Sequence, residues 1–265
     1  MKMLSSAEQA VIKKDFGEIW SIKMVRSTMI LLPVVMAVFL PILYLVIICF
    51  VPSSQMNGVD QMLKMLPKET NGFSMQQNMF YLMTNMICPL FFLMIPLMSS
   101  SVSAACSFVG EKERSTLETL LLTPLSVKSI FKAKVLGCII LSAISTAISF
   151  IAFSIVISVG NIILKMPFFF NWNWLILIFL FAPAVTVFGV VFIVLVSGRS
   201  KSYMESMQAS GYIVLPLIFL FIGQFTGLFQ LGPMLLLLAA GVVIVLDLCL
   251  WIFASRSFTP EKLLK

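Results

Sequence analysis

The side chains in this sequence that could do chemistry are mainly charged, and several of them gather in one short stretch. Read as a helix, Glu111, Arg114 and Glu118 fall at positions i, i+3 and i+7, which places them on one face. Leucines such as Leu117 and Leu121 supply an apolar component, so the helix is expected to be amphipathic. Such an ionic face can pair with charges on another protein. The simpler interpretation is a solvated loop with no specific contacts, and both interpretations stay open at this point.

Residues for other kinds of chemistry are scarce. The sequence has no histidine, which excludes histidine metal ligands, histidine general bases and Ser-His triads. The five cysteines lie in or beside apolar runs without a CxxC pair, so we expect no disulfide framework and no metal site. The phosphate-binding pattern GxxxxGK[ST] does not occur. We therefore expect no ATP site, no bound cofactor and no enzyme activity in this chain.

The composition is that of an integral membrane protein. Hydrophobic residues make up 60% of the chain and charged residues only 11%, against about 25% charged residues in an ordinary soluble domain. A helix needs about 20 apolar residues to cross a bilayer, and the alternation of barrel strands is absent. Six apolar runs are long enough, at about 27–51, 79–106, 135–160, 174–197, 209–229 and 232–254. The predicted fold class is an all-α membrane protein with six transmembrane helices.

Basic residues predict the orientation of these helices, because short loops rich in Lys and Arg stay on the cytoplasmic side. Five basic residues lie in segment 1–26, five in the stretch 110–134, two in the loop 198–208 and three in the tail 255–265. The other side holds Lys64, Lys68 and Lys165. Both termini are therefore expected in the cytoplasm, and the six-helix domain at 27–254 is expected in the cytoplasmic membrane.

An amphipathic helix is predicted before the first membrane helix, within residues 1–26. The apolar face would carry Ile12, Phe16, Ile19 and Trp20. The polar face would carry Lys14, Glu18 and Ser21. A helix of this kind lies in the membrane interface. Trp20 is then expected at the depth of the lipid headgroups.

The charged stretch is also expected to contain a bend. Pro124 cannot continue a helix, and Ser126 is placed to cap the next one, which runs on into the third membrane helix. The result is a short amphipathic helix across the cytoplasmic surface, joined at a bend to a membrane helix. This arrangement suits a lever that another protein moves.

Two features inside the predicted membrane helices could matter for function or packing. Asp247 is an acidic residue well inside the sixth helix, where a carboxylate is costly and is a candidate functional site. The other interpretation is a structural Asp that bonds to Arg256 or to a polar neighbour. In the second helix, the small residues of Met98–Ser107 predict close approach of a neighbouring helix.

The sequence GEKERSTLETLLLTPLS, residues 110–126, resembles the signature of ABC-2 type transporter permeases, such as the sodium and drug exporter permeases. The positions that the resemblance implies in coupling to an ATPase are Gly110, Glu111, Lys112, Glu113, Arg114, Thr116, Leu117, Glu118, Leu121 and Pro124. The stretch SGRSKSYMESMQ is similar to the second cytoplasmic loop of the family, and its charged residues include Arg199, Lys201 and Glu205. The ending FASRSFTPEKLL is similar to the usual finish of the family.

The resemblance implies the permease subunit of an ATP-driven exporter, in which two permeases, identical or different, form the substrate pathway. Separate cassette ATPases would bind ATP and Mg and would dock on a coupling helix at 111–124. Sodium, drug, lipid and peptide exporters share this layout, so the resemblance assigns no substrate. The alternative is a stand-alone secondary transporter or channel. An intramembrane enzyme would need a histidine, paired acids or a metal cluster, which the sequence lacks.

Overall fold

The fold is known from a computed structural model, which describes residues 6–50, 66, 70, 72–114, 116, 126–198, 200, 202–226, 228 and 232–257, with side chains up to Ser255. Within these residues the secondary structure is helical and contains no strand. The predicted all-α class is confirmed for this part of the chain.

Among the described residues, six helices are long and apolar enough to cross a membrane, as the sequence predicts. Three of them contain π-helical turns, which are labelled η, in direct succession with α-helices. The six membrane helices are, in order, Lys23–Phe50 (α2 Lys23–Arg26, η1 Ser27–Leu31, α3 Leu32–Phe50), Met75–Glu113 (α5 Met75–Leu82, η4 Met83–Ile87, α6 Cys88–Ala104, η5 Ala105–Val109, α7 Gly110–Glu113), α9 Val127–Ile163, Trp172–Ser197 (α10 Trp172–Ile176, η6 Leu177–Phe181, α11 Ala182–Ser197), α12 Tyr203–Phe225 and α13 Pro233–Ser257. The helix α1 (Ser6–Ser21) precedes them.

The second and third membrane helices are longer than the apolar runs at 79–106 and 135–160 that predicted them. Their polar ends stay helical because side chains such as that of Lys134 find partners inside the protein. The predicted cap of α9 is confirmed. The hydroxyl of Ser126 accepts a hydrogen bond from the backbone N–H of Ser129 (3.2 Å) and so satisfies one of the free donors at the start of the helix.

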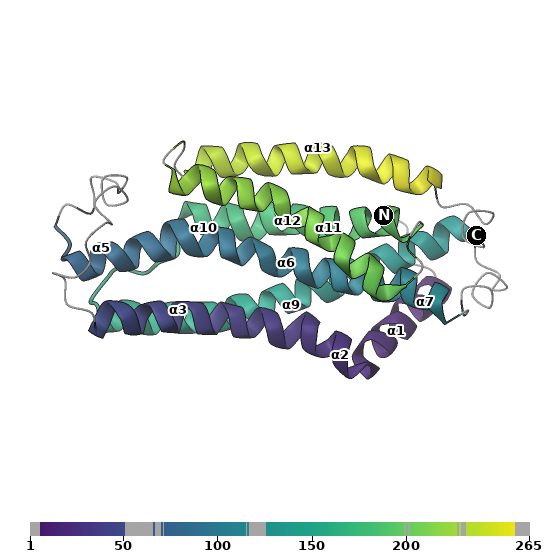
Figure 1. Cartoon of the computed structure of the whole chain (residues 1–265), viewed down its shortest axis with the longest axis horizontal. Coiled ribbons are helices and arrows are strands. Elements are labelled where there is room, and N and C mark those ends of the chain that lie inside the picture. Colours follow the sequence, from purple (N-terminus) through teal and green to yellow (C-terminus); the bar gives the residue numbers. More distant parts are fainter. Residues whose placement is uncertain are drawn as a thin grey trace.

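The helices form one elongated bundle in which the second membrane helix is central (Figure 1). Its α6 segment packs against α9, α11 and α12, while α3 packs on α9, and α13 packs on α11. The second and fourth membrane helices are the most buried, and the other four expose broad apolar faces. Because the helices alternate in direction, α1 and the end of α13 lie at the same end of the bundle (Figure 1).

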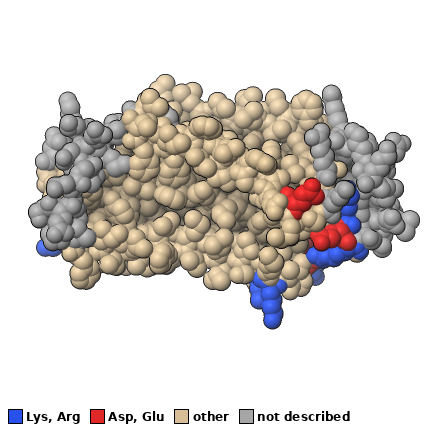
Figure 2. Space-filling model, viewed as in Figure 1, with Lys and Arg blue, Asp and Glu red and all other residues tan. Residues whose placement is uncertain are grey.

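Charged side chains gather at this end, which we call the charged end (Figure 2). It comprises α1, α7 and the first turns of α9 and α12. The sides of the bundle in the same view are almost free of charge, as expected for a surface in contact with lipid tails.

Three of the π-helical turns end two residues before a proline, at Pro33, Pro89 and Pro183. A proline ring has no N–H and clashes with the carbonyl four residues earlier, so a wider turn there relieves the clash. The carbonyl of Met29, four residues before Pro33, shows how the lost donor is replaced. The hydroxyls of Ser145 (2.5 Å) and Ser99 (3.2 Å) both lie within hydrogen-bonding distance of it, so the first, second and third membrane helices meet at one carbonyl.

Removing both hydroxyls, with Ser99→Ala and Ser145→Ala, is expected to lower the free energy of unfolding by about 1–2 kcal/mol, since hydrogen bonds between membrane helices contribute about 0.6 kcal/mol each and at most about 1.7. The measurement is SDS-induced unfolding in mixed micelles. In a Pro33→Ala background the N–H of residue 33 can bond the Met29 carbonyl, so the double change should cost less there. An equal cost in both backgrounds would contradict this role for the hydroxyls.

The predicted close approach at Met98–Ser107 is also found, between the second and fourth membrane helices. At Gly189 in α11, a Cβ atom would lie 2.1 Å from Oγ of Ser100 and 3.3 Å from its Cβ. Ser100 is fully buried, and its hydroxyl donates to the carbonyl of Leu97 (2.9 Å). Only a glycine at position 189 lets the two most buried helices come this close.

Candidate functional site

The helix α1 is held against the charged end by a mixed polar and apolar face. It ends at Ser21, and the extended backbone of Ile22 separates it from α2. Its buried side chains are Val11, Asp15 and Ile19, spaced four residues apart on one face that packs on α9 and η5. Asp15 is the unexpected member, because it brings a carboxylate into the interior.

This orientation divides the predicted apolar face of α1 between the bundle and the outside. Ile19 is buried, but Phe16 and Trp20 are exposed by 38% and 44%, and their rings stack with centroids 5.9 Å apart. The helix is rotated away from its most hydrophobic side because Asp15 must face a buried lysine. Phe16 and Trp20 are left free to contact lipid, and the expected headgroup depth of Trp20 stays a prediction.

The buried lysine is Lys134, in the second turn of α9. Its ammonium group lies 3.1 Å from Asp15 Oδ2 and 2.9 Å from Glu111 Oε2. It also donates to the backbone carbonyl of Ser107 (2.9 Å), and the Ser107 hydroxyl in turn donates to Asp15 (2.6 Å). All four side chains are at least 96% buried. The ring of Phe108, 5.6 Å from the ammonium nitrogen, covers another side of it.

Glu111 joins the second and third membrane helices to α1. One carboxylate oxygen faces Lys134, and the other lies 2.5 Å from Nζ of Lys14. The side chain is only 1% exposed. The expectation that Glu111 belongs to an outward ionic face is therefore wrong within this subunit, because two lysines draw its carboxylate inward.

Arg114 and Glu113, next to Glu111 in the sequence, bind other helices. Arg114 forms an ion pair with Glu18 of α1. The other carboxylate oxygen of Glu18, Oε2, lies 3.9 Å from Nζ of Lys14. Glu113 accepts a hydrogen bond from the backbone N–H of Tyr203 (3.0 Å), the first residue of α12. The charged residues of this short motif thus contact the ends of α1, α9 and α12, which lie far apart in the sequence.

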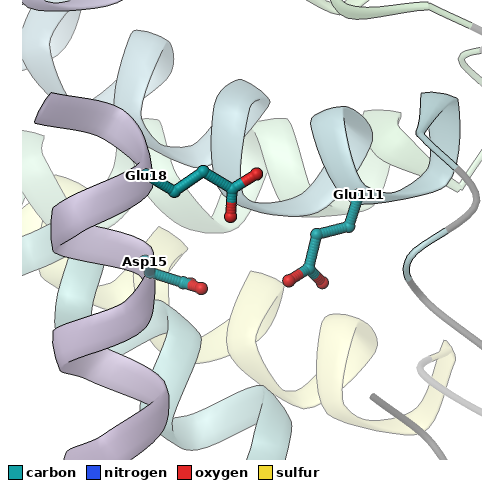
Figure 3. A group of neighbouring side chains, drawn as sticks. All are labelled: Asp15, Glu18 and Glu111. Carbon is teal, nitrogen blue, oxygen red and sulfur yellow. The ribbon is translucent and has the colours of Figure 1, made fainter. Parts of the chain in front are cut away.

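We call Lys14, Asp15, Glu18, Glu111, Arg114 and Lys134 the charged cluster. Its three carboxylates, those of Asp15, Glu18 and Glu111, point toward one another from two helices (Figure 3). Their nearest oxygens all lie within 4.8 Å of one another, a spacing that would suit a metal ion. Lys14, Arg114 and Lys134 already pair with them, however, so three negative charges meet three positive ones. The arrangement suits a charge-balanced clamp between helices better than a cation site.

The remaining predicted coupling residues are only partly described. Gly110 is buried, Lys112 is half-buried, and the backbone N–H of Thr116 donates to the carbonyl of Glu111 (3.0 Å). The helical part that is described, α7, ends at Glu113. Leu117, Glu118, Leu121 and Pro124 lie outside the described residues, so the predicted helix over 111–122 stays a prediction.

A family model for the ABC-2 family transporter protein matches residues 9–239 of the chain. The chain belongs to the ABC-2 transporter family. No curated protein and no solved structure matches it. The family assignment confirms the resemblance seen in the charged stretch and favours an ABC transporter permease over a stand-alone secondary transporter or channel. It also makes the chain a multi-pass membrane protein of a transport system.

In this ABC-2 permease, the stretch that resembles the second loop of the family leads into the start of α12. The hydroxyl of Ser202 accepts a hydrogen bond from the backbone N–H of Glu205 (3.2 Å) and caps the helix. The side chain of Glu205 is exposed. Arg199 and Lys201 lie outside the described residues.

Asp247 lies in the buried stripe of α13, between Ala240 and Ala254, and is 6% exposed. Within the described part of the permease, its Oδ1 atom has no hydrogen-bond partner. The side chain of Arg256, one of the partners considered from the sequence, is outside that part. The described residues therefore give this oxygen no hydrogen bond of the kind that a purely structural role for Asp247 would need.

Sequence reasoning missed the roles of Asp15, Ser107 and Lys134. A signal for two of them exists in the sequence. Asp15 lies four residues after Val11 and four residues before Ile19, so all three share one helix face. Lys134 lies between apolar neighbours in a helix. A charged residue in an apolar face predicts a buried partner of opposite charge, although it does not say which one.

Proposed function

We propose that this protein is the permease subunit of an ATP-driven exporter. Two permease subunits form the substrate pathway, and separate cassette ATPases, which hold ATP and Mg, dock on segment 111–124. Both termini and the charged end face the cytoplasm. The excess of Lys and Arg in the segments that lead to this end supports the orientation.

The observation that carries the proposal is the set of contacts made by the GEKER motif. Glu111 binds α9 and α1, Glu113 binds the first turn of α12, and Arg114 binds α1. The second membrane helix itself ends in this motif. A force applied to the segment that follows it would therefore reach four of the helices that meet at the charged end.

The buried position of Glu111 changes which residues are proposed to touch the ATPase. Glu111 and Lys134 fix the base of the segment, so contact with the ATPase falls to the residues beyond Arg114, among them Glu118, and to Glu205 on α12. The motif then acts as the rigid joint, and the residues after it form the docking surface.

Reversing the charge of Glu118, with Glu118→Lys, is expected to weaken retention of the cassette ATPase that co-purifies with the permease. A charge that is desolvated in a protein interface costs about 2–5 kcal/mol when its pair is broken, so binding should weaken roughly thirtyfold or more. The measurement is co-purification of the ATPase from membranes, together with ATP hydrolysis by the complex in nanodiscs.

Lys132→Glu is the matched control, because Lys132 is an exposed charge at the same end of the bundle but outside the segment. It should leave retention unchanged. If both variants keep the ATPase, or if both lose it equally, the segment is only a charged topology anchor. The permease bundle is expected to fold in each case, since neither change touches a buried side chain of the described part.

A further inference from the structure

A groove lies at the elbow between α1 and the first membrane helix. Its volume is about 530 Å3, and its lining residues are Trp20, Lys23, Arg26, Ser27, Ile30, Leu31 and Val34. The extended backbone at Ile22 opens the angle between the two helices (Figure 1). The groove therefore exists because α1 is clamped to the bundle rather than continuous with the first membrane helix.

The polar end of the groove is positively charged. Lys23 and Arg26 are exposed, and within the described residues neither of them forms an ion pair. Lys14, Arg114 and Lys134, in contrast, each pair with a carboxylate. Where Figure 1 places α2, Figure 2 shows blue atoms with no red atoms beside them. The guanidinium of Arg26 lies 5.9 Å from the ring centroid of Trp20, which holds it at the rim. The groove lining contains no acidic residue.

The other end of the groove is apolar. Ile30, Leu31 and Val34 continue along the same helix toward the middle of the membrane, and Leu31 is 59% exposed. At a rise of about 1.5 Å per residue, Val34 lies about 12 Å beyond Arg26 along the helix axis. Charge at one end and hydrocarbon contact at the other, over this length, match a lipid headgroup and the upper part of its acyl chains.

We propose that this elbow groove binds an anionic phospholipid, with the phosphate at Lys23, Arg26 and Ser27, the headgroup edge against Trp20, and an acyl chain along Ile30, Leu31 and Val34. The site lies outside the proposed ATPase surface and does not depend on it. Positive charge beside a membrane helix is common and by itself only orients the protein. The groove differs because aromatic, basic and apolar groups line one concave surface.

The test is native mass spectrometry of the purified permease after incubation with equal amounts of phosphatidylglycerol and phosphatidylcholine. The wild-type protein should retain phosphatidylglycerol preferentially. A basic side chain near an anionic headgroup contributes about fivefold to binding, so Lys23→Gln with Arg26→Gln should lower this preference by roughly tenfold or more. Leu31→Gln should reduce retention of both lipids in the groove, because it removes the contact with the acyl chain.

Lys13→Gln with Lys132→Gln is the matched control, since it removes two exposed charges at the same end of the bundle but outside the groove. It should change the preference less than twofold. Equal losses in the two double variants would overturn the proposal in favour of general surface charge. Equal retention of the two lipids by the wild-type protein would also overturn it, and so would displacement of the lipid by millimolar inorganic phosphate, which would indicate a simple anion site.

Discussion

Replacing Lys134 with methionine is expected to lower the free energy of unfolding by about 3–5 kcal/mol, enough to prevent accumulation of the folded permease. The change leaves the carboxylates of Asp15 and Glu111 buried without the ammonium group that lies 3.1 and 2.9 Å from them. Methionine fills a similar volume, so the loss comes from uncompensated charge and not from a cavity. The measurement is SDS-induced unfolding in mixed micelles, with the yield of monodisperse protein as a second readout.

Two further variants separate this explanation from a general intolerance of the site. Lys132→Met changes an exposed lysine of the same helix and should cost less than about 0.5 kcal/mol. Combining Lys134→Met with Asp15→Asn and Glu111→Gln removes all three charges together and should recover most of the stability. If the triple variant is no more stable than Lys134→Met, charge balance is not what the lysine provides.

Replacing Gly189 with valine is expected to cost about 3 kcal/mol, at the upper end of the usual range for overpacked cores. The added Cβ would lie 2.1 Å from Oγ of Ser100 and 3.3 Å from its Cβ. The hydroxyl can rotate away, but the Cβ of Ser100 is fixed to the backbone of the second membrane helix. The fourth membrane helix must then move off the second, which separates the two most buried helices. Thermal unfolding in detergent, followed by near-ultraviolet circular dichroism, measures the effect.

Gly211→Val is the matched control, because Gly211 is also helical but a Cβ there meets nothing within 4 Å. It should change stability by less than about 0.5 kcal/mol. Ser100→Gly should restore part of the loss in the Gly189→Val background, since it removes the nearest obstacle. Similar costs at the two glycines would show that helix propensity, and not the close approach, sets the effect.

The six membrane helices and the start of α9 could be predicted because their causes are local. The length of an apolar run decides whether a helix can cross a bilayer, and the hydroxyl of Ser126 caps a helix three residues away. The charged cluster could not be predicted in this way. Lys134 is 119 residues from Asp15, and Lys14 is 97 residues from Glu111, and no periodicity within one segment reports such pairs.

The orientation of α1 has the same origin. The segment alone predicts an apolar face with Phe16, Ile19 and Trp20 in the membrane interface, and it gives Asp15 no inward partner. In the protein, Asp15 faces inward with Ile19, because a lysine of another helix stabilises it there. The choice between the two faces depends on the partner, and a single segment does not contain that information.

The clamp between α1 and Lys134 has a consequence for how the protein is made. The first helix leaves the ribosome long before the third membrane helix, yet the ammonium group that neutralises Asp15 arrives only with that third helix. Docking of α1 on the second membrane helix alone would bury the carboxylates of Asp15 and Glu111 without that ammonium group, so we expect α1 to stay at the membrane surface until then. Docking of α1 therefore reports that the second and third membrane helices have been inserted side by side, and a nascent chain arrested earlier would present α1 to proteases and chaperones.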